Sequence, residues 1–207
     1  MLDDLIKLYT GQNMHVKLYV GARSRLLKLN YYLQFLPHAG LIVDVGCGYG
    51  VLANYFSLNL PENQIIGIDL NSKRIAVASQ TVGKRRNIKF ISHDAVKWSW
   101  PKCSGIIMTS FLHHIPPSNQ KMVLDKAGQS LEKGGVLLIA EVDPDAKPVY
   151  RYWSSYLSDR ILYPASKSYF GTSEYWCGIL DKPGFTLETL RPRSFAFAGI
   201  VYICRKV

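Results

Sequence analysis

Three glycines in a short loop are the residues of this sequence best suited to hold a ligand against the main chain. Gly46, Gly48 and Gly50 follow the apolar run 41–45, and a helical pattern comes next. Glycine in a strand-to-helix turn lets backbone atoms approach a ligand where side chains would block it. The spacing is G-x-G-x-G, whereas a dinucleotide fingerprint reads G-x-G-x-x-G. Asp44 precedes the loop, and an acid there suits a ligand with an ammonium group better than a pyrophosphate.

Two further acids follow the next two apolar runs. Asp69 ends the run 65–68 and lies 19 residues beyond Gly50, where a carboxylate can accept hydrogen bonds from both hydroxyls of a ribose. Asp94 and Ala95 follow the third run, where a carboxylate can accept from an adenine amino group. Each acid alone would more often be a helix cap or loop residue. Together, each at its own strand end, they predict a nucleotide-like ligand at one edge of a sheet.

The elements that must position these residues alternate between strand and helix from residue 41 onward. Such alternation predicts a parallel sheet with helices on both faces. Asn71 or Ser72 and Ser118 are the expected N-caps of two of the helices. The last two strands can pair as a hairpin across 191–198. The expected strands are 41–45, 64–68, 88–92, 105–109, 136–140, 185–190 and 199–204.

These elements predict an α/β fold with a doubly wound, mostly parallel seven-stranded sheet and a C-terminal antiparallel hairpin. We expect residues 1–207 to form one domain, because no repeat, low-complexity segment or linker interrupts the chain. Residues 1–40 are expected to form a helical cap and residues 41–143 the cofactor-binding core. In the helical cap, leucines recur at helical spacing until a proline ends the pattern: Leu26, Leu29, Leu33, Leu36 and Pro37.

In these motifs the sequence resembles the class I S-adenosylmethionine (SAM)-dependent methyltransferases, over about residues 42–143. It is most similar to their small-molecule branch, which includes the ubiquinone/menaquinone C-methyltransferases and the type 11 group. The resemblance implies a Rossmann-like methyltransferase fold, SAM as cofactor and S-adenosylhomocysteine (SAH) as product. It also implies a set of cofactor-binding residues: Asp44, Gly46, Cys47, Gly48, Gly50, Asp69, Leu70, Asp94, Ala95 and Ser110.

Two more segments match the family in order. Residues 110–116, Ser-Phe-Leu-His-His-Ile-Pro, resemble the L-H-H-x-P segment after the fourth strand, and residues 131–135 match the turn before the fifth. Members that methylate adenine N6 or glutamine carry N/D-P-P-Y/F after the fourth strand. This chain has Thr-Ser-Phe-Leu at 109–112, so that chemistry is not expected.

Three side chains in or near these two segments can accept and donate a proton. His113 and His114 follow the fourth strand and Glu141 follows the fifth, where relatives place the methyl group. A general base is needed only if the acceptor must lose a proton. We therefore hold these residues as candidate catalysts. The alternative is that one histidine orders the loop and the other packs.

The acceptor must be inferred from the aromatic-rich segment 147–176, which holds nine aromatic residues. One helical face is expected over 148–162. Such a face is either a stripe packed in the core or a wall of an acceptor pocket for an apolar or lipid-like molecule. The aromatics alternate with basic residues, so contact with an anionic membrane surface is a further expectation. The expected face consists of Val149, Tyr152, Trp153, Tyr156 and Ile161.

Composition and charge bear on the binding partners, the metal content and the location of the protein. The 207 residues carry a net charge of +10, spread along the chain, with the densest cluster at 84–89. That cluster is a solvated loop or a site of attraction to membrane, phosphorylated substrate or RNA. The four cysteines form no CxxC pair, so neither a disulfide framework nor a metal site is expected. No apolar run approaches a membrane span, and the N-terminus lacks a signal-peptide pattern, so we expect a cytoplasmic protein, peripheral to the membrane at most.

The expected function is methyl transfer from SAM to a small apolar or lipid-like acceptor. Two alternatives stay open: a SAM-binding sensor or non-catalytic subunit, and an RNA methyltransferase. Nucleic acid is the less expected partner, because no RNA-binding module or long basic tail is present in the sequence.

Overall fold

The computed structural model describes residues 2–162, 167–182, 184–192 and 199–207. They contain a seven-stranded sheet in the order β3-β2-β1-β4-β5-β7-β6. The strands β1 to β5 pair in parallel, and β7 runs antiparallel to both β5 and β6. The expected sheet and its C-terminal hairpin are confirmed. The strands are β1 Gly40–Val45, β2 Asn63–Asp69, β3 Ile88–Ser92, β4 Cys103–Thr109, β5 Leu131–Val142, β6 Phe185–Leu190 and β7 Gly199–Lys206.

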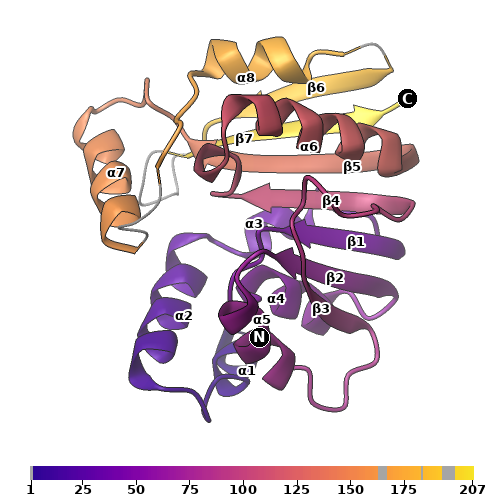
Figure 1. The fold of residues 1–207 in the computed structure, drawn as a ribbon, viewed down its shortest axis with the longest axis vertical. Coiled ribbons are helices and arrows are strands. Elements are labelled where there is room, and N and C mark those ends of the chain that lie inside the picture. The colour runs from indigo at the N-terminus through magenta and orange to yellow at the C-terminus, as the bar shows by residue number, and fades with distance from the viewer. Residues whose placement is uncertain (1, 163–166, 183, 193–198) are drawn as a thin grey trace.

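The helices form two layers around this sheet. Alternate strand residues point to opposite faces, so neighbours such as Ile42 and Val43, or Leu137 and Leu138, belong to different core clusters. One cluster packs against α1 to α4 and the other against α6 and α8 (Figure 1). The helices are α1 Leu2–Lys7, α2 Met14–Leu26, α3 Asn30–Leu33, α4 Val51–Asn59, α5 Ser72–Gln80, a 3₁₀ turn η1 Leu112–His114, α6 Pro117–Ser130, α7 Tyr150–Leu162 and α8 Ser173–Leu180.

The strand order reverses between β1 and β4. From β1 the chain steps outward to β2 and β3, then crosses back to β4 on the other side. Ligands of open α/β sheets bind in the crevice that such a reversal leaves at the carboxyl ends of the strands. Figure 1 shows α2 and α7 at this edge, beyond the arrowheads of β1 and β4.

The N-terminal leucine pattern does not form one helix. α2 ends at Leu26, and Lys28 adopts a left-handed conformation (φ 49°) before the short α3 begins. Leu29 and Leu36 are buried, but Leu26 is 44% exposed. The break at Lys28 rotates the later leucines onto the core, which periodicity alone does not reveal.

One of the expected helix caps is correct and one is wrong. The Asn71 side chain accepts a hydrogen bond from the Arg74 N–H at the start of α5. Ser118 does not cap α6, because that helix begins at Pro117 with Pro116 as its N-cap residue. Proline at the first helical position loses no hydrogen bond there, and the Asn119 N–H, in the first turn, donates to the Pro116 carbonyl oxygen at 2.9 Å.

Candidate functional site

The glycine loop presents bare main chain at the carboxyl end of β1. Gly46, Gly48 and Gly50 all have positive φ, at 74°, 57° and 77°. A Cβ on Gly46 would lie 2.4 Å from the ring of Phe111, so only glycine permits this packing. At Gly48 the nearest atom to an added Cβ is the Tyr19 hydroxyl oxygen, 4.0 Å away. The backbone at Gly48 therefore faces open space.

Asp44 lies beneath this loop with only 1% of its surface exposed. Its Oδ2 accepts a hydrogen bond of 3.1 Å from the Ala53 N–H, in the first turn of α4. Burial raises the pKa of Asp44 to about 7, while the Ala53 N–H and the Arg23 guanidinium oppose that rise. A desolvated carboxylate beside a cavity is stabilised by a cation.

The cavity beside Asp44 is closed by α2, which supplies two residues that sequence reasoning missed. Tyr19 and Arg23 line it together with Asp44, Cys47 and Ser110. An Arg23 Nη atom donates to the Thr109 carbonyl oxygen, 3.3 Å away, at the end of β4. The available signal was an arginine on the helical stripe that also carries the buried Val16, Val20 and Leu27.

Asp69 ties the glycine loop to the end of β2. Its Oδ2 accepts from the Gly48 N–H and its Oδ1 from the Asn71 N–H, both at 2.8 Å. The neighbouring Leu70 is 74% exposed, which is unusual for so large an apolar side chain next to a cavity. The Asp69 carboxylate thus lies at the edge of the glycine loop, beside the exposed apolar side chain of Leu70.

A second cavity continues from the first along the ends of β2 and β3. Gly46 borders both cavities, so the two adjoin. Within the second, the Asp94 Oδ1 accepts from the Val96 N–H at 2.8 Å, and Ala95 is buried. The predicted residues Asp69, Leu70, Asp94 and Ala95 all line it, together with Phe111 and His93, which the sequence did not single out.

Ser110 and Cys47 complete the loop region. Ser110 follows β4 with φ 48°, and its N–H donates to the Ala140 carbonyl oxygen at 2.8 Å. A non-glycine residue at positive φ stores strain of the kind that collects at functional sites. Burial raises the pKa of the Cys47 thiol well above its usual value, so Cys47 is not activated as a nucleophile.

The structure brings His113 and Glu141 together as a buried pair. The Glu141 Oε2 contacts the His113 Nδ1, and each side chain is 1% exposed. The Glu141 Oε1 accepts from the N–H groups of Phe111 and Leu112, at 3.1 and 2.8 Å. Glu141 therefore fixes both the loop after β4 and the orientation of the His113 ring, and leaves Nε2 as the ring nitrogen not engaged by the carboxylate.

Aromatic rings cover this pair. Phe170 stacks on the His113 ring, with the two ring centroids 4.8 Å apart. The His114 ring also lies against the His113 ring, with centroids 4.1 Å apart. Tyr152 and Tyr156 of α7 pack around Phe170 at 6.1 and 6.0 Å. The aromatic segment is thus continuous with the histidines. The Ile161 side chain and Tyr163 lie outside the described residues.

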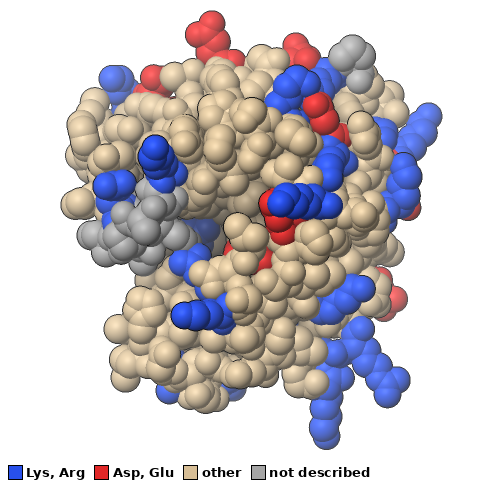
Figure 2. All heavy atoms as spheres, in the orientation of Figure 1, with Lys and Arg blue, Asp and Glu red and all other residues tan. Residues whose placement is uncertain are grey.

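The rest of the α7 face is open to solvent. Val149 is 49% exposed and Trp153 59%, so neither belongs to the core. Tyr150 and Leu157 are also exposed, at 70% and 60%. On the face shown in Figure 2 the molecule is hollowed near its centre, with Lys and Arg side chains on the left side of the hollow.

Two negative findings concern only the part of the chain that the structure describes. Within it, no three His, Cys, Asp or Glu side chains gather closely enough to hold a metal ion. None of its helices combines the length and the hydropathy that crossing a membrane requires.

Comparison with known protein families finds a match to the part of the chain that holds the glycine loop. Residues 42–135 match the family described as a methyltransferase domain. The match starts in β1 and ends inside β5, so it covers the glycine loop and the three acids but not α7.

Among curated proteins, the chain is similar to a malonyl-[acyl-carrier protein] O-methyltransferase from Legionella pneumophila. The two are 29% identical over 135 residues, which cover 64% of this chain and 46% of the relative. A carboxy-S-adenosyl-L-methionine synthase from Helicobacter pylori is 30% identical over 148 residues, 68% of this chain and 58% of the relative. The chain thus spans about half the length of the curated relatives it matches.

Solved structures with the same fold include a magnesium protoporphyrin IX methyltransferase from Synechocystis with bound SAH. It has a TM-score of 0.67 at 17% identity, covering 99% of this chain and 94% of that one. The pyocyanin biosynthetic protein PhzM has a TM-score of 0.74 at 14% identity, covering 97% of this chain and 60% of that one. At these identities the likeness concerns the fold.

Proposed function

We propose that this chain, which belongs to the class I SAM-dependent methyltransferases, transfers a methyl group from SAM to a small acceptor with an apolar, lipid-like body. The observation that carries the proposal is the arrangement of two adjoining cavities along the ends of β1, β2 and β3. Their acids stand in the order that an amino-acid group, a ribose and an adenine require. The cavities lie next to a loop that holds a buried His–Glu pair.

The residues present fit this cofactor. Asp44 and Arg23 border one cavity with opposite charges, which match the ammonium and carboxylate of an amino-acid group. The raised pKa of Asp44 supports this reading, because an ammonium ligand would compensate its desolvation. Asp69 would accept from the ribose, and Asp94 from the adenine amino group. Leu70 and Phe111 supply apolar surfaces for the flat base.

When bound, the cofactor supplies a methyl group activated by its positively charged sulfur. Charge is dispersed in this transfer, so the protein contributes chiefly by aligning the reactants and excluding water. The glycine loop and Asp69 hold the nucleotide side, and Phe111 stacks above Gly46. The cover of Phe170, Tyr152 and Tyr156 keeps the adjoining space dry.

For an acceptor that must lose a proton, His113 is the residue we assign as proton acceptor. Its Nδ1 faces the Glu141 carboxylate, an arrangement that places the ring proton on Nδ1 and the lone pair on Nε2. Phe170 stacks on the face of the His113 ring, whereas the Nε2 lone pair lies in the plane of that ring. Glu141 acts as a positioning residue in this scheme.

The apolar acceptor is inferred from the surface of α7 and α2. Trp153, Leu157 and Tyr150 on α7 and Met14 and Leu18 on α2 are each at least 59% exposed. Both helices stand at the edge where the parallel strands end (Figure 1). Exposed aromatic and aliphatic side chains at a site entrance suit a lipid-like molecule or contact with a membrane that contains it.

A turnover assay with methyl-labelled SAM and a broad acceptor panel tests the proposal. We expect label transfer to an apolar acceptor. Binding of SAM without transfer to any acceptor would instead indicate a sensor or a non-catalytic subunit. Transfer to RNA with little transfer to small molecules would indicate the RNA methyltransferase.

A further inference from the structure

A third cavity lies just beyond the carboxyl end of β5, outside both cavities assigned to the cofactor. It has a volume of about 490 Å³, within the range of small-molecule sites. Among the described residues, none that lines this cavity also lines the other two. Those that line it come from the loop between β5 and α7, the first turn of α7, the two residues after β6 and the start of β7.

Basic side chains dominate the lining of this cavity. Lys147, Arg151 and Arg191 face two acids, Asp143 and Asp145. Asp143 is 1% exposed, and both of its carboxylate oxygens are hydrogen-bonded. Its Oδ2 accepts from the Arg191 Nε–H at 2.7 Å, and its Oδ1 accepts from the Asp145 N–H at 3.1 Å. Among the described lining residues, the three basic side chains thus outnumber the two acidic ones by one.

The Asp143 contact also sets the direction of the Arg191 side chain. Because Asp143 binds the Nε–H, the edge of the guanidinium between its two Nη atoms is not the edge that this contact uses. The Arg191 side chain is 54% exposed, so these atoms are accessible. A guanidinium fixed in this way is prepared for a two-point contact with a carboxylate or phosphate.

The cavity adjoins the site described above. Asp143 lies two residues after Glu141 on β5, and in the β5–β7 pair Glu141 is opposite Ile200 and Val142 opposite Gly199. Gly199 lines the cavity. Arg151 lies next to Tyr152, whose ring packs on Phe170 over His113. The cavity and the aromatic cover thus share α7, and the cavity lies just beyond the end of β5, the strand that carries Glu141.

The geometry points to an anion-binding subsite in this cavity, with Arg191 as its two-point contact and Lys147 and Arg151 as further cations. It would hold an acidic group, a carboxylate or a phosphate, on an otherwise apolar acceptor. The binding of an anion rests on the cavity alone, whereas its role as part of the acceptor rests on the function proposed above.

Inorganic phosphate and acetate are suitable probes, titrated at constant ionic strength with chloride as the balancing anion. The readout is the NMR signal of the Arg191 Nε–H group, assigned by its loss in Arg191→Gln. We expect a saturable shift with a low-millimolar Kd for at least one of the two anions. The anion that binds more tightly identifies the acidic group as phosphate-like or carboxylate-like, and either result supports the subsite.

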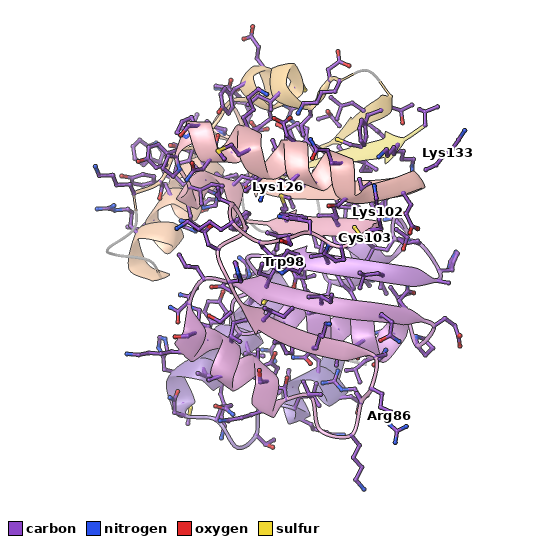
Figure 3. The ribbon with its side chains drawn as sticks, turned by 45° about the vertical axis from the view of Figure 1, so that its right-hand side comes forward. Arg86, Trp98, Lys102, Cys103, Lys126 and Lys133 are labelled. Atoms are coloured by element: carbon purple, nitrogen blue, oxygen red, sulfur yellow. The ribbon has the colours of Figure 1, made fainter. Side chains whose placement is uncertain are left out.

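Variants separate this site from general surface attraction. Other backbone N–H signals around the cavity report binding in Arg191→Gln, where we expect at least a tenfold loss of affinity. Lys147 is exposed, and Lys147→Gln should weaken anion binding threefold or more. This second variant still tests the subsite if Arg191→Gln fails to fold because Asp143 has lost its ion-pair partner. Arg86→Gln is the matched control, because Figure 3 shows Arg86 before β3, at the opposite edge of the sheet. It should bind like wild type.

Two outcomes would overturn the subsite. One is a shift that grows linearly without saturation in the wild type. The other is equal affinity in Arg191→Gln, Lys147→Gln and Arg86→Gln, which would indicate an adventitious ion only. SAH titrated into the same samples keeps the two proposals apart. Anion binding without SAH binding would contradict the methyltransferase function and leave the subsite in place.

Discussion

Asp44 is the residue in which the charge of the site and the stability of the fold are most closely linked. It is buried, and its neighbours supply one N–H and the Arg23 guanidinium, while Asp69 adds a like charge that raises the pKa further. Without a bound cation, ionised Asp44 destabilises the folded state. The same carboxylate gains a partner when an ammonium group enters the cavity.

This linkage predicts a pH dependence with a defined sign. Asp44 has a folded pKa of about 7 and an unfolded pKa of about 4, so between these values the folded state binds more protons than the unfolded state. The free energy of unfolding should therefore fall as pH rises from 4 to 7. Asp44→Asn should remove this slope and, above pH 7, raise the free energy of unfolding by about 2–4 kcal/mol. Urea unfolding at pH 5 and pH 8 measures both.

Affinity for SAH should change in the opposite direction. A cationic ammonium group favours ionised Asp44, so wild-type affinity should rise as pH increases through about 7. Asp44→Asn should bind SAH more weakly and without that rise. A parallel pH profile for the variant and the wild type would show that Asp44 does not face the ammonium group.

The His113–Glu141 pair predicts a separation of turnover from binding. His113→Ala should lower kcat about 10²-fold or more, the usual contribution of a general base, with SAH affinity within about twofold of wild type. The kcat of the wild type should fall at acidic pH as the base is protonated, and the variant should lack that dependence. The measurements are kcat against pH and calorimetry with SAH.

Glu141→Gln distinguishes the two roles of the carboxylate. The amide oxygen can still accept from the N–H groups of Phe111 and Leu112, but the charge opposite His113 is lost. We expect kcat to fall and the loop to persist. If SAH affinity and kcat decline together in both variants, the pair shapes the cofactor loop and His113 is not the base.

Among the helices and strands, α7 is the element whose side chains can be tested for a role in core packing as opposed to acceptor binding. Tyr152→Ala should raise the acceptor KM or abolish turnover with SAH affinity near wild type, because Tyr152 is only partly buried and packs on Phe170. Trp176→Ala is the contrasting variant. Trp176, on the buried side of α8, is 1% exposed, so its truncation should cost about 3–5 kcal/mol of stability and weaken the binding of both ligands.

Thermal unfolding measured beside both affinities decides the question for α7. A large fall in Tm for Tyr152→Ala with unchanged acceptor selectivity would mean that the α7 face packs and does not bind the acceptor.

Local patterns were sufficient to predict most elements. The apolar runs gave the strands within one or two residues at most ends, because a buried strand needs continuous apolar residues and the turns between strands carry their own residue types. β5 is the exception: it begins at Leu131, five residues before the expected run. The glycine loop and the three acids were predictable because each is read from a few consecutive residues.

The residues that were missed depend on contacts between distant segments. Arg23 meets Thr109 across 86 positions, and Arg191 meets Asp143 across 48. Arg85 is similar, since its guanidinium donates to Asn54 Oδ1 at 2.7 Å and to the Thr81 carbonyl at 2.6 Å. This arginine therefore stabilises the packing of α4 against α5, whereas the sequence alone offered only a solvated loop or a site of anion attraction.

The net charge of +10 of the whole molecule is spread along the sequence. On the face shown in Figure 2, Lys and Arg side chains lie at several separate places. Lys102 and Lys133, like Arg86, lie toward the amino-terminal edge of the sheet in Figure 3. On the face in Figure 2 the basic side chains form separate groups, a pattern typical of general attraction to anionic surfaces.

Vesicle binding tests the open face at the site entrance. The wild type should partition onto vesicles with anionic lipid more strongly than onto zwitterionic ones, and less strongly as salt increases. Replacing Trp153 and Leu157 together by serine should reduce partitioning about tenfold or more, because both apolar side chains are at least 59% exposed. Co-sedimentation measures this, and equal partitioning of the double variant and wild type would contradict a role for α7 at the membrane.

Calorimetry with SAH on matched variants tests whether the glycine loop and the acids at the strand ends bind SAM. We predict micromolar-range binding to wild type and a loss of about 1.5–3 kcal/mol in Asp69→Ala, which removes a charged hydrogen-bond acceptor. Gly48→Val should bind still more weakly, since its side chain would project into the open space above the loop and force a β-branched residue to positive φ. Thermal unfolding of each variant confirms that the fold persists. Absence of SAH binding to folded wild type, or unchanged affinity in both variants, would contradict the account.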